Sequence, residues 1–305
     1  MRAVTISDGR LLVEERPDPV PGEGQILIRV RAAGINAADL LQRAGHYPPP
    51  ADAPADIPGL ECAGEVVATG RHAARFAVGD RVLALLGGGG QAELVAVHER
   101  HALALPAGVD WPSAGGFVEG YATAHDAVFT QGSLAVGERL LVNGAAGGVG
   151  VAAVQLGVTA GARVTANARH SGERLEALGA GLAVEGPYDV ILELVGGEQF
   201  VRDVELLATG GRLVVIGTGA GARAEVDFGQ LMRRRARISA STLRARPLEE
   251  KAIVVQRLER QVVPLLAAGR IGVAVERTFP LDEAEAAYDA FAAGGKFGKL
   301  VLLVP

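Results

Sequence analysis

The sequence predicts an α/β protein in which a β-rich first third is followed by a doubly wound parallel sheet. Short apolar segments separated by Gly and Pro fill the first third of the 305 residues, and from about Trp111 strand-like and helix-like segments alternate. A turn with the sequence "GAAGGVG", residues 144–150, lies between the first strand and the first helix of that alternation. Alternating β and α segments with short joints are typical of a parallel sheet with helices on both faces.

The first third contains three strand candidates. Residues 25–35, "QILIRVRAAGI", alternate apolar and polar side chains as a half-buried strand does, and residues 63–70 and 80–86 have the composition of further short strands. The five prolines between residues 48 and 58 predict a stiff, extended loop there.

The remainder of the chain is predicted to alternate between strands and helices. Its strand candidates are residues 139–143, 163–168, 189–195, 212–217 and 237–242, and its helix candidates are residues 150–161, 172–179, 198–210 and 227–236. The last portion is predicted to hold one long helix over 247–269, a strand over 275–281, a helix over 282–294 and a closing strand over 298–304.

Composition excludes several function classes. The formal net charge of −5 gives no reason to expect nucleic acid or an anionic membrane as a partner. Cys62 is the one cysteine, so an intrachain disulfide framework is excluded, and we expect a cytoplasmic protein. The uncharged stretch 140–162 is long enough to cross a bilayer, but its six glycines predict buried structure of a protein that is not membrane-bound. No secretory signal is expected, because Asp8 and Arg10 interrupt the apolar start.

The glycine-rich turn predicts a dinucleotide site. Ala145-x-Gly147-x-x-Gly150 follows a strand, precedes a helix, and matches the dinucleotide fingerprint with alanine at its first glycine. Glycine lets the backbone approach a pyrophosphate, and the helix N-terminus supplies unpaired N–H groups and a partial positive charge. The alternative is a tight turn that serves helix packing alone.

The end of the second strand of this alternation predicts NADPH as the cofactor. A site that prefers NAD has an acidic residue there, whereas this strand ends at Asn167 and is followed by Arg169. A guanidinium can pair with the 2′-phosphate of NADPH. The alternative for Arg169 is an ordinary solvated loop arginine. Gly217, at the end of the strand at 212–217, either lines the nicotinamide side or makes a plain turn.

These motifs resemble the medium-chain dehydrogenase/reductase superfamily, and more closely its zinc-independent, zeta-crystallin-type NADPH:quinone oxidoreductases. The resemblance covers essentially the whole chain and is carried by "GINAADLLQRAGHYPPP", "IPGLECAGEV", "GDRVLALLGGGGQAELV", "VEGYATAHDAV", "VNGAAGGVG", "ASTLRARPLEEK" and "GKFGKLVLLV". It implies a GroES-like β domain over 1–118 that is completed by 247–305, a Rossmann domain over 119–246, and an active site in the cleft between them.

The resemblance also implies that no metal takes part. Zinc-dependent members carry Cys and His at the positions of Asn36 and Leu60, and their third ligand falls near Glu119. Leucine cannot coordinate zinc, which needs three protein ligands in a catalytic site. We therefore expect no metal ion here, and we interpret Glu61 and Glu119 as scattered structural carboxylates.

The resemblance places Asn36 and Tyr47 in the substrate cleft as the catalytic residues, with Asp39 and Gln42 nearby. The Tyr47 ring can stack on a flat substrate, and its hydroxyl can donate to a carbonyl. Asn36 can bind a carbonyl or the nicotinamide ribose. The alternatives are that Asn36 only caps the following helix and that Tyr47 anchors the proline loop.

The resemblance adds Thr123, Thr242 and Leu243 near the nicotinamide. The predicted cofactor-binding set is thus Gly144, Ala146, Gly147, Gly148, Val149, Asn167, Arg169, Gly217, Thr123, Thr242 and Leu243. Two departures from the family bear on the cofactor. Ala146 replaces a common serine, and the connection over 179–191 is short and lacks an Asn-Tyr pair that often helps hold the adenosine phosphate, which leaves Arg169 with more of that task.

These observations predict NADPH-dependent reduction of a small-molecule quinone by hydride transfer from the nicotinamide. Two alternatives stay open: an enoyl or enone reductase of the same superfamily, and a dinucleotide-binding protein with negligible turnover. We also expect a homodimer, as the family resemblance implies and because the apolar strand at 237–242 could pair edge to edge across a two-fold axis.

Overall fold

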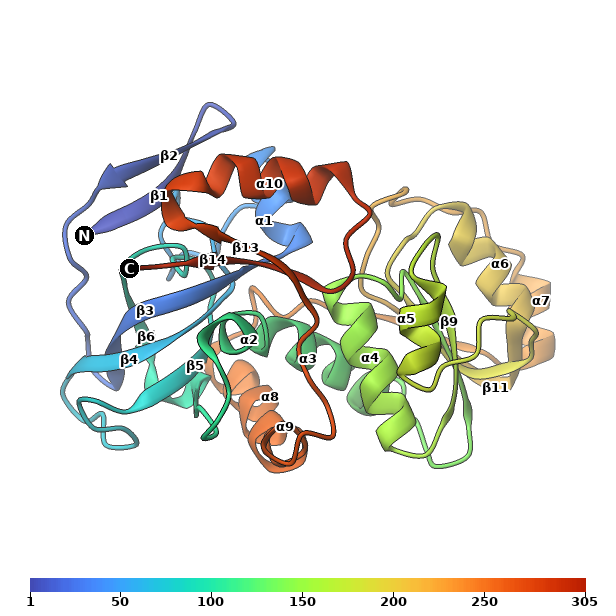
Figure 1. The fold of residues 1–305 in the computed structure, drawn as a ribbon. Helices are drawn as coiled ribbons and strands as arrows, with labels where there is room; N and C mark the ends of the chain where they lie inside the picture. Colours follow the sequence, from blue (N-terminus) through green and yellow to red (C-terminus); the bar gives the residue numbers. More distant parts are fainter. The chain divides into compact units, whose positions relative to one another are not determined.

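The computed structural model describes all 305 residues, and the chain divides into two compact units (Figure 1). The first unit consists of Met1–Ala122 and Leu243–Pro305, and the second of Thr123–Thr242. The GroES-like β architecture and the doubly wound sheet that the sequence predicts are both present.

The first unit is built on a seven-stranded sheet with the order β13-β14-β3-β4-β5-β7, in which β6 also pairs with β3. Its strands are β3 (Gln25–Ile35), β4 (Glu61–Thr69), β5 (Arg81–Leu85), β6 (Leu94–His98), β7 (Ala102–Ala104), β13 (Val275–Pro280) and β14 (Lys299–Leu303), and β1 (Arg2–Ser7) pairs with β2 (Arg10–Glu15) in a separate hairpin. Its helices are α1 (Ala37–Arg43), α2 (Trp111–Gly115), α8 (Leu248–Gln261), α9 (Val263–Ala267) and α10 (Ala284–Ala293), with short 3-10 turns at Glu99–His101 and Leu281–Glu283.

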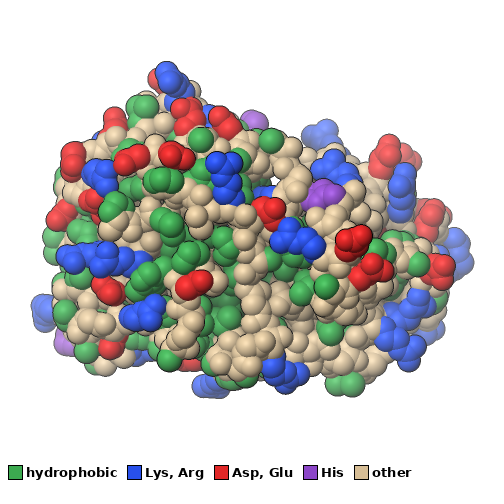
Figure 2. Space-filling model, viewed as in Figure 1, with side chains coloured by type: hydrophobic (Ala, Val, Ile, Leu, Met, Phe, Trp, Pro, Cys, Tyr) green, Lys and Arg blue, Asp and Glu red, His purple; other side chains and the backbone are tan.

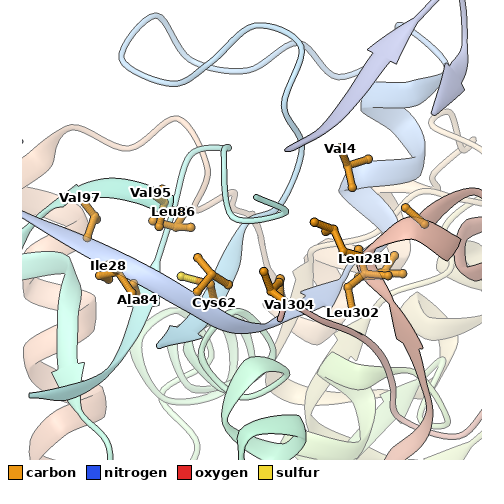
Figure 3. Close-up of a cluster of buried hydrophobic side chains, with 14 of the residues drawn as sticks. Val4, Ile28, Cys62, Ala84, Leu86, Val95, Val97, Leu281, Leu302 and Val304 are labelled. Carbon is orange, nitrogen blue, oxygen red and sulfur yellow. The ribbon is translucent and has the colours of Figure 1, made fainter. Parts of the chain in front are cut away.

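The two ends of the chain meet in this sheet. β14, from the C-terminal segment, runs antiparallel to β3 and lies beside it in Figure 1. Inward-facing side chains of both segments form one apolar core, because alternate residues of a strand point to the same face. Figure 3 shows members of this core from several elements: Val4, Ile28, Cys62, Ala84, Leu86, Val95, Val97, Leu281, Leu302 and Val304.

The second unit is a five-stranded parallel sheet with the order β12-β11-β10-β8-β9. Its strands are β8 (Arg139–Asn143), β9 (Arg163–Asn167), β10 (Tyr188–Glu193), β11 (Leu207–Val215) and β12 (Arg237–Ala240). The connecting helices are α4 (Gly148–Thr159), α5 (Gly172–Ala177), α6 (Glu198–Leu206) and α7 (Phe228–Arg234). The helix α3 (Val118–His125) and a π-helical turn at Asp126–Gln131 precede β8.

The order of this sheet reverses at β8, whose neighbours are β9 on one side and β10 on the other. In open α/β sheets, ligands bind at such a switch point, outside the carboxyl ends of the strands. Between α5 and β10 the chain forms no strand, and only an isolated bridge joins Thr165 to Gly181. The short connection seen in the sequence therefore leaves five strands where the six-stranded form of this fold has one more.

Two predicted helices differ from the structure. The expected single helix over 247–269 is broken into α8 and α9, since Pro264 lies in the first turn of α9, where a proline is tolerated but cannot continue the preceding helix. The expected helix over 198–210 ends at Leu206, where the backbone becomes extended and β11 begins.

The uncharged stretch 140–162 forms β8, the glycine turn and α4, and most of it is buried, as predicted. None of the helices combines the length and the apolar character that a membrane span requires. On the face shown in Figure 2, acidic and basic side chains are interspersed.

Candidate active site

The glycine turn between β8 and α4 depends on glycine at several positions. Gly144 has φ +71°, a left-handed conformation that favours glycine, and Gly147 is the N-cap residue of α4. A Cβ on Gly150 would lie 2.6 Å from the Ala145 Cα, so this glycine lets α4 pack against the turn. A Cβ on Gly147 would meet only the Gly144 carbonyl oxygen, at 3.5 Å.

Five of the predicted cofactor residues lie together in this turn: Gly144, Ala146, Gly147, Gly148 and Val149. Ala146 is buried, whereas Gly147 to Val149 are half-buried. The N–H groups of the first turn of a helix have no partner within the helix. Those of α4 therefore face a partly open surface at the carboxyl edge of the sheet, where they can bind an anion.

Asn167 and Arg169 follow β9 at the same edge but have different surroundings. The Asn167 side-chain amide donates to the Asn143 Oδ1 at 2.8 Å, so it is held within the sheet edge. Arg169 is exposed, and no Asp or Glu lies between Asn167 and the start of α5. Arg169 is thus an exposed cation at this edge.

Gly217 lies where two loops of this edge touch. A Cβ at this position would be 3.0 Å from the Leu194 Cα, so glycine permits the close approach of the loop after β10 to the end of β11. Thr123, which is buried on α3, and the exposed Thr242 after β12 are the first and last residues of the second unit. Leu243 is buried in the first unit.

In the first unit, Asn36 belongs to a buried polar cluster. It is the N-cap residue of α1, and its backbone N–H donates to the Asp39 carboxylate at 2.8 Å. Its side-chain Nδ2 donates to the Glu61 Oε1 at 3.0 Å, and its Oδ1 accepts from the Lys299 Nζ at 2.7 Å. The Lys299 Nζ also contacts the Glu61 Oε1, at 2.5 Å.

Glu119 completes this cluster, because its backbone N–H donates to the Glu61 Oε2 at 3.0 Å. Burial, reinforced by the negative charge of Glu61, raises the pKa of Glu119 to about 8, so its carboxyl group keeps a proton at neutral pH. Burial also raises the pKa of Asp39 to about 6. Glu61 and Glu119 are scattered in the sequence, but the fold brings them together in one cluster.

The residues of this cluster do not fit a zinc ion. Leu60 is buried and has no donor atom, and the Lys299 ammonium already bonds to Asn36 and Glu61. No group of three or more His, Cys, Asp or Glu side chains in the structure could hold a metal ion. A catalytic zinc needs three such ligands.

Tyr47 is held by Arg244, which is not among the predicted site residues. The Arg244 guanidinium lies 5.1 Å from the centre of the Tyr47 ring, and its Nη1 donates to the Tyr47 carbonyl oxygen at 2.9 Å. Its Nη2 donates to the Gln42 Oε1 at 2.5 Å and its Nε to the Gly87 carbonyl oxygen at 2.8 Å. The side chain joins α1, the proline loop and the loop after β5.

Comparisons with known proteins agree with this description. Residues 22–107 match the family described as the alcohol dehydrogenase GroES-like domain, and residues 146–302 match the family described as zinc-binding dehydrogenase. The chain belongs to the medium-chain dehydrogenase/reductase superfamily.

Relatives of this superfamily member include proteins with reductase names. It is 29% identical to a quinone oxidoreductase of Lama guanicoe, over 100% of this chain and 98% of that protein. It is 34% identical to prostaglandin reductase-3 of Mus musculus, over 95% of this chain and 84% of that protein. Among solved structures it is similar to an alcohol dehydrogenase superfamily protein from Novosphingobium aromaticivorans, with a TM-score of 0.90, 27% identity and full coverage of both chains.

Proposed function

We propose that this protein is an NADPH-dependent reductase of quinones that works without a metal ion. The observation that carries the proposal is the buried cluster around Lys299. At the positions that the family resemblance assigns to zinc ligands, this chain has an amide, a leucine and a protonated carboxyl group, beside a lysine ammonium. The full-length similarity to quinone oxidoreductases supports the choice of substrate.

The cofactor part of the proposal rests on the carboxyl edge of the parallel sheet. The first-turn N–H groups of α4 bind the pyrophosphate, and the glycine turn leaves room for it. Arg169 pairs with the 2′-phosphate, and no carboxylate at the end of β9 repels that phosphate. The bound nicotinamide supplies the hydride.

The substrate part rests on Asn36 and Tyr47. The Asn36 Nδ2 carries two hydrogens, of which Glu61 accepts one, so the other can bind a substrate carbonyl. The Tyr47 hydroxyl is a second donor for the oxygen on which negative charge develops. Reduction of a quinone to a hydroquinone takes up one hydride and one proton, and we assign delivery of that single proton to the Tyr47 hydroxyl.

The test is steady-state oxidation of NADPH, with 1,2-naphthoquinone and crotonyl-CoA as alternative acceptors. We expect turnover with the quinone, unchanged by a zinc chelator, and little with the thioester. Tyr47→Phe serves as the matched variant, because it keeps the ring and removes the donor. Loss of turnover in the presence of the zinc chelator would contradict the proposal.

A second candidate is an enoyl or enone reductase, which the prostaglandin reductase-3 name of a 34% identical relative favours. Faster NADPH oxidation with crotonyl-CoA than with the quinone would establish it in place of the first. Binding of NADPH without oxidation by either acceptor would instead indicate a nucleotide-binding protein.

A further inference from the structure

A buried acidic pair lies at the switch point of the parallel sheet. β8 and β10 are neighbours there, and Asn143 and Glu193 are their last residues. Asp203, on α6, is the third member of the group, and all three residues are 0% exposed.

The side-chain amide of Asn143 has too few hydrogens for the carboxyl oxygens that surround it. The Asn143 Nδ2 lies 2.8 Å from the Glu193 Oε2 and 2.8 Å from each of the two Asp203 carboxyl oxygens. Its two hydrogens cannot serve all three. The Asn143 Oδ1 accepts from Asn167, which fixes the end of the amide that faces the acids, and the Gln199 Nε2 donates to the Asp203 Oδ1 at 2.9 Å.

No cation compensates the pair. The contacts of Glu193 and Asp203 are with amides and backbone N–H groups, and neither residue forms an ion pair. Arg234, on the adjacent helix α7, donates instead to the carbonyl oxygens of Leu207 and Glu205. Two ionised carboxylates in such a place would repel each other and lose their hydration, so one of them must hold a proton.

Asp203 is the member that holds it. Glu193 is occupied as an acceptor, because its Oε1 accepts the backbone N–H of Val195 and, at 2.7 Å, that of Gly196. The Asp203 carboxyl group can therefore donate to Glu193. Burial and then this bond raise the pKa of Asp203 to about 8.

The same network reaches three loops at the carboxyl edge. Glu193 holds the loop 194–197, whose Val195 carbonyl oxygen accepts from the Ala220 N–H in the loop after β11. Through Asn143 and Asn167 the network continues to the end of β9, and the Asn167 carbonyl oxygen accepts the Ala145 N–H of the glycine turn at 3.1 Å.

We propose that Asp203 is a positioning residue for the nucleotide: as a neutral acid it bridges Asn143 and Glu193 and so holds the loops that surround the cofactor. When Asp203 ionises, the two carboxylates repel each other, the loops separate, and nucleotide affinity falls in alkaline solution. This inference rests on the proposed binding of a dinucleotide at the glycine turn.

The test compares the wild-type protein with Asp203→Asn, which has nearly the same shape and cannot ionise. Fluorescence titration gives the Kd for NADPH at about pH 7 and at about pH 9.5. We expect the wild-type affinity to fall by about tenfold over this range, the change that one pKa unit represents. The affinity of Asp203→Asn should stay constant.

Two controls isolate the effect. Glu205→Gln removes an exposed acid of the same helix and should keep the wild-type profile. Glu119→Gln removes the other acid whose pKa is raised to about 8, and it should also keep the alkaline loss of affinity. If Asp203→Asn does not fold, Glu193→Gln replaces it, because removal of the second carboxylate should abolish the pH dependence equally.

A wild-type Kd for NADPH that does not change with pH would overturn the inference. A loss of NADPH affinity at high pH that persists in Asp203→Asn would overturn it as well. Failure of the wild-type protein to bind NADPH at any pH would overturn the proposed function and the positioning role together. Thermal unfolding at different pH values tests the protonation of Asp203 without NADPH, so it distinguishes a failure to bind the nucleotide from a wrong assignment of the proton. Since the folded state raises this pKa, the stabilisation is fully present below the unfolded value of 3.8 and is lost as the pH rises through about 8. Glu119 adds a similar loss to both proteins, so the fall in stability should be larger in the wild-type protein than in Asp203→Asn.

Discussion

Lys299 and Glu61, 238 positions apart in the chain, form an ion pair of 2.5 Å with side chains that are 5% and 0% exposed. The pair joins β14 to β4 across the sheet of the first unit. A buried charge is tolerated only when it is paired and hydrogen-bonded, and Asn36 and the Glu119 N–H supply the additional bonds. The fold thus fixes a positive charge beside Asn36.

Lys299→Met should destabilise the protein strongly, because it leaves the Glu61 carboxylate buried without its partner. Breaking a buried pair in this way costs about 3–5 kcal/mol. Chemical denaturation measures the free energy of unfolding. The exposed pair between Arg75 and Glu259 provides the control, and Arg75→Met should cost less than about 1 kcal/mol. Equal losses in the two variants would show that the Lys299 pair contributes no more than a surface contact.

Arg244→Lys should lower kcat for the quinone while leaving the Kd for NADPH unchanged. Lysine keeps the charge but cannot bond simultaneously to Gln42, Tyr47 and Gly87 as the guanidinium does. Tyr47→Phe should reduce kcat by about tenfold or more, within the range typical of a lost proton donor. If Arg244 acts through Tyr47, the double variant loses less than the sum of the two single losses. Additive losses would mean that the two residues act independently.

Arg169→Asp should shift the cofactor preference from NADPH towards NADH, because a carboxylate repels the 2′-phosphate and can bind the ribose hydroxyl groups. The ratio of kcat/KM for the two cofactors measures the preference, and we expect it to change by about tenfold or more. Arg163, an exposed residue at the opposite end of β9, is the control position. Equal ratios in Arg169→Asp and Arg163→Asp would show that Arg169 does not contact the phosphate.

We propose that two copies of the chain pair through β12, which lies at one edge of the parallel sheet. Phe228 and Met232 on the preceding helix are 75% and 77% exposed, and Ile238 on the strand is 40% exposed. Light scattering should give about twice the chain mass of 31.4 kDa, and Phe228→Asp should give a monomer. Val20→Asp, at an 86% exposed position of the other unit, should remain dimeric. A wild-type monomer at micromolar concentration would refute the dimer.

Local patterns predict the elements of this fold well. The strand–turn–helix around Gly144 to Gly150 and the alternation of the second unit are visible in the sequence, because periodicity and glycine spacing are local properties. The errors also have local causes. Pro264 interrupts a helical pattern that is otherwise continuous. After Leu206 the backbone becomes extended and β11 begins, although the apolar pattern of the helix continues past this residue.

The polar clusters could not be predicted in the same way. Glu61, Glu119 and Lys299 come from three distant segments, so nothing in their local sequence shows that they meet. Asp203 lies in a helix with charged neighbours and has the pattern of an ordinary solvated residue; only the packing of α6 on the sheet buries it beside Glu193. The one available signal was position, since Asn143 and Glu193 end adjacent strands of a doubly wound sheet.

The most direct test of the proposed function is a single-turnover experiment on protein from which metal has been removed by a chelator. NADPH and 1,2-naphthoquinone are added in equal amounts to the chelated protein, and the absorbance of NADPH is followed. We expect oxidation of one NADPH for each quinone, at the rate of the untreated protein. Activity that returns only after zinc is added would contradict the proposed function.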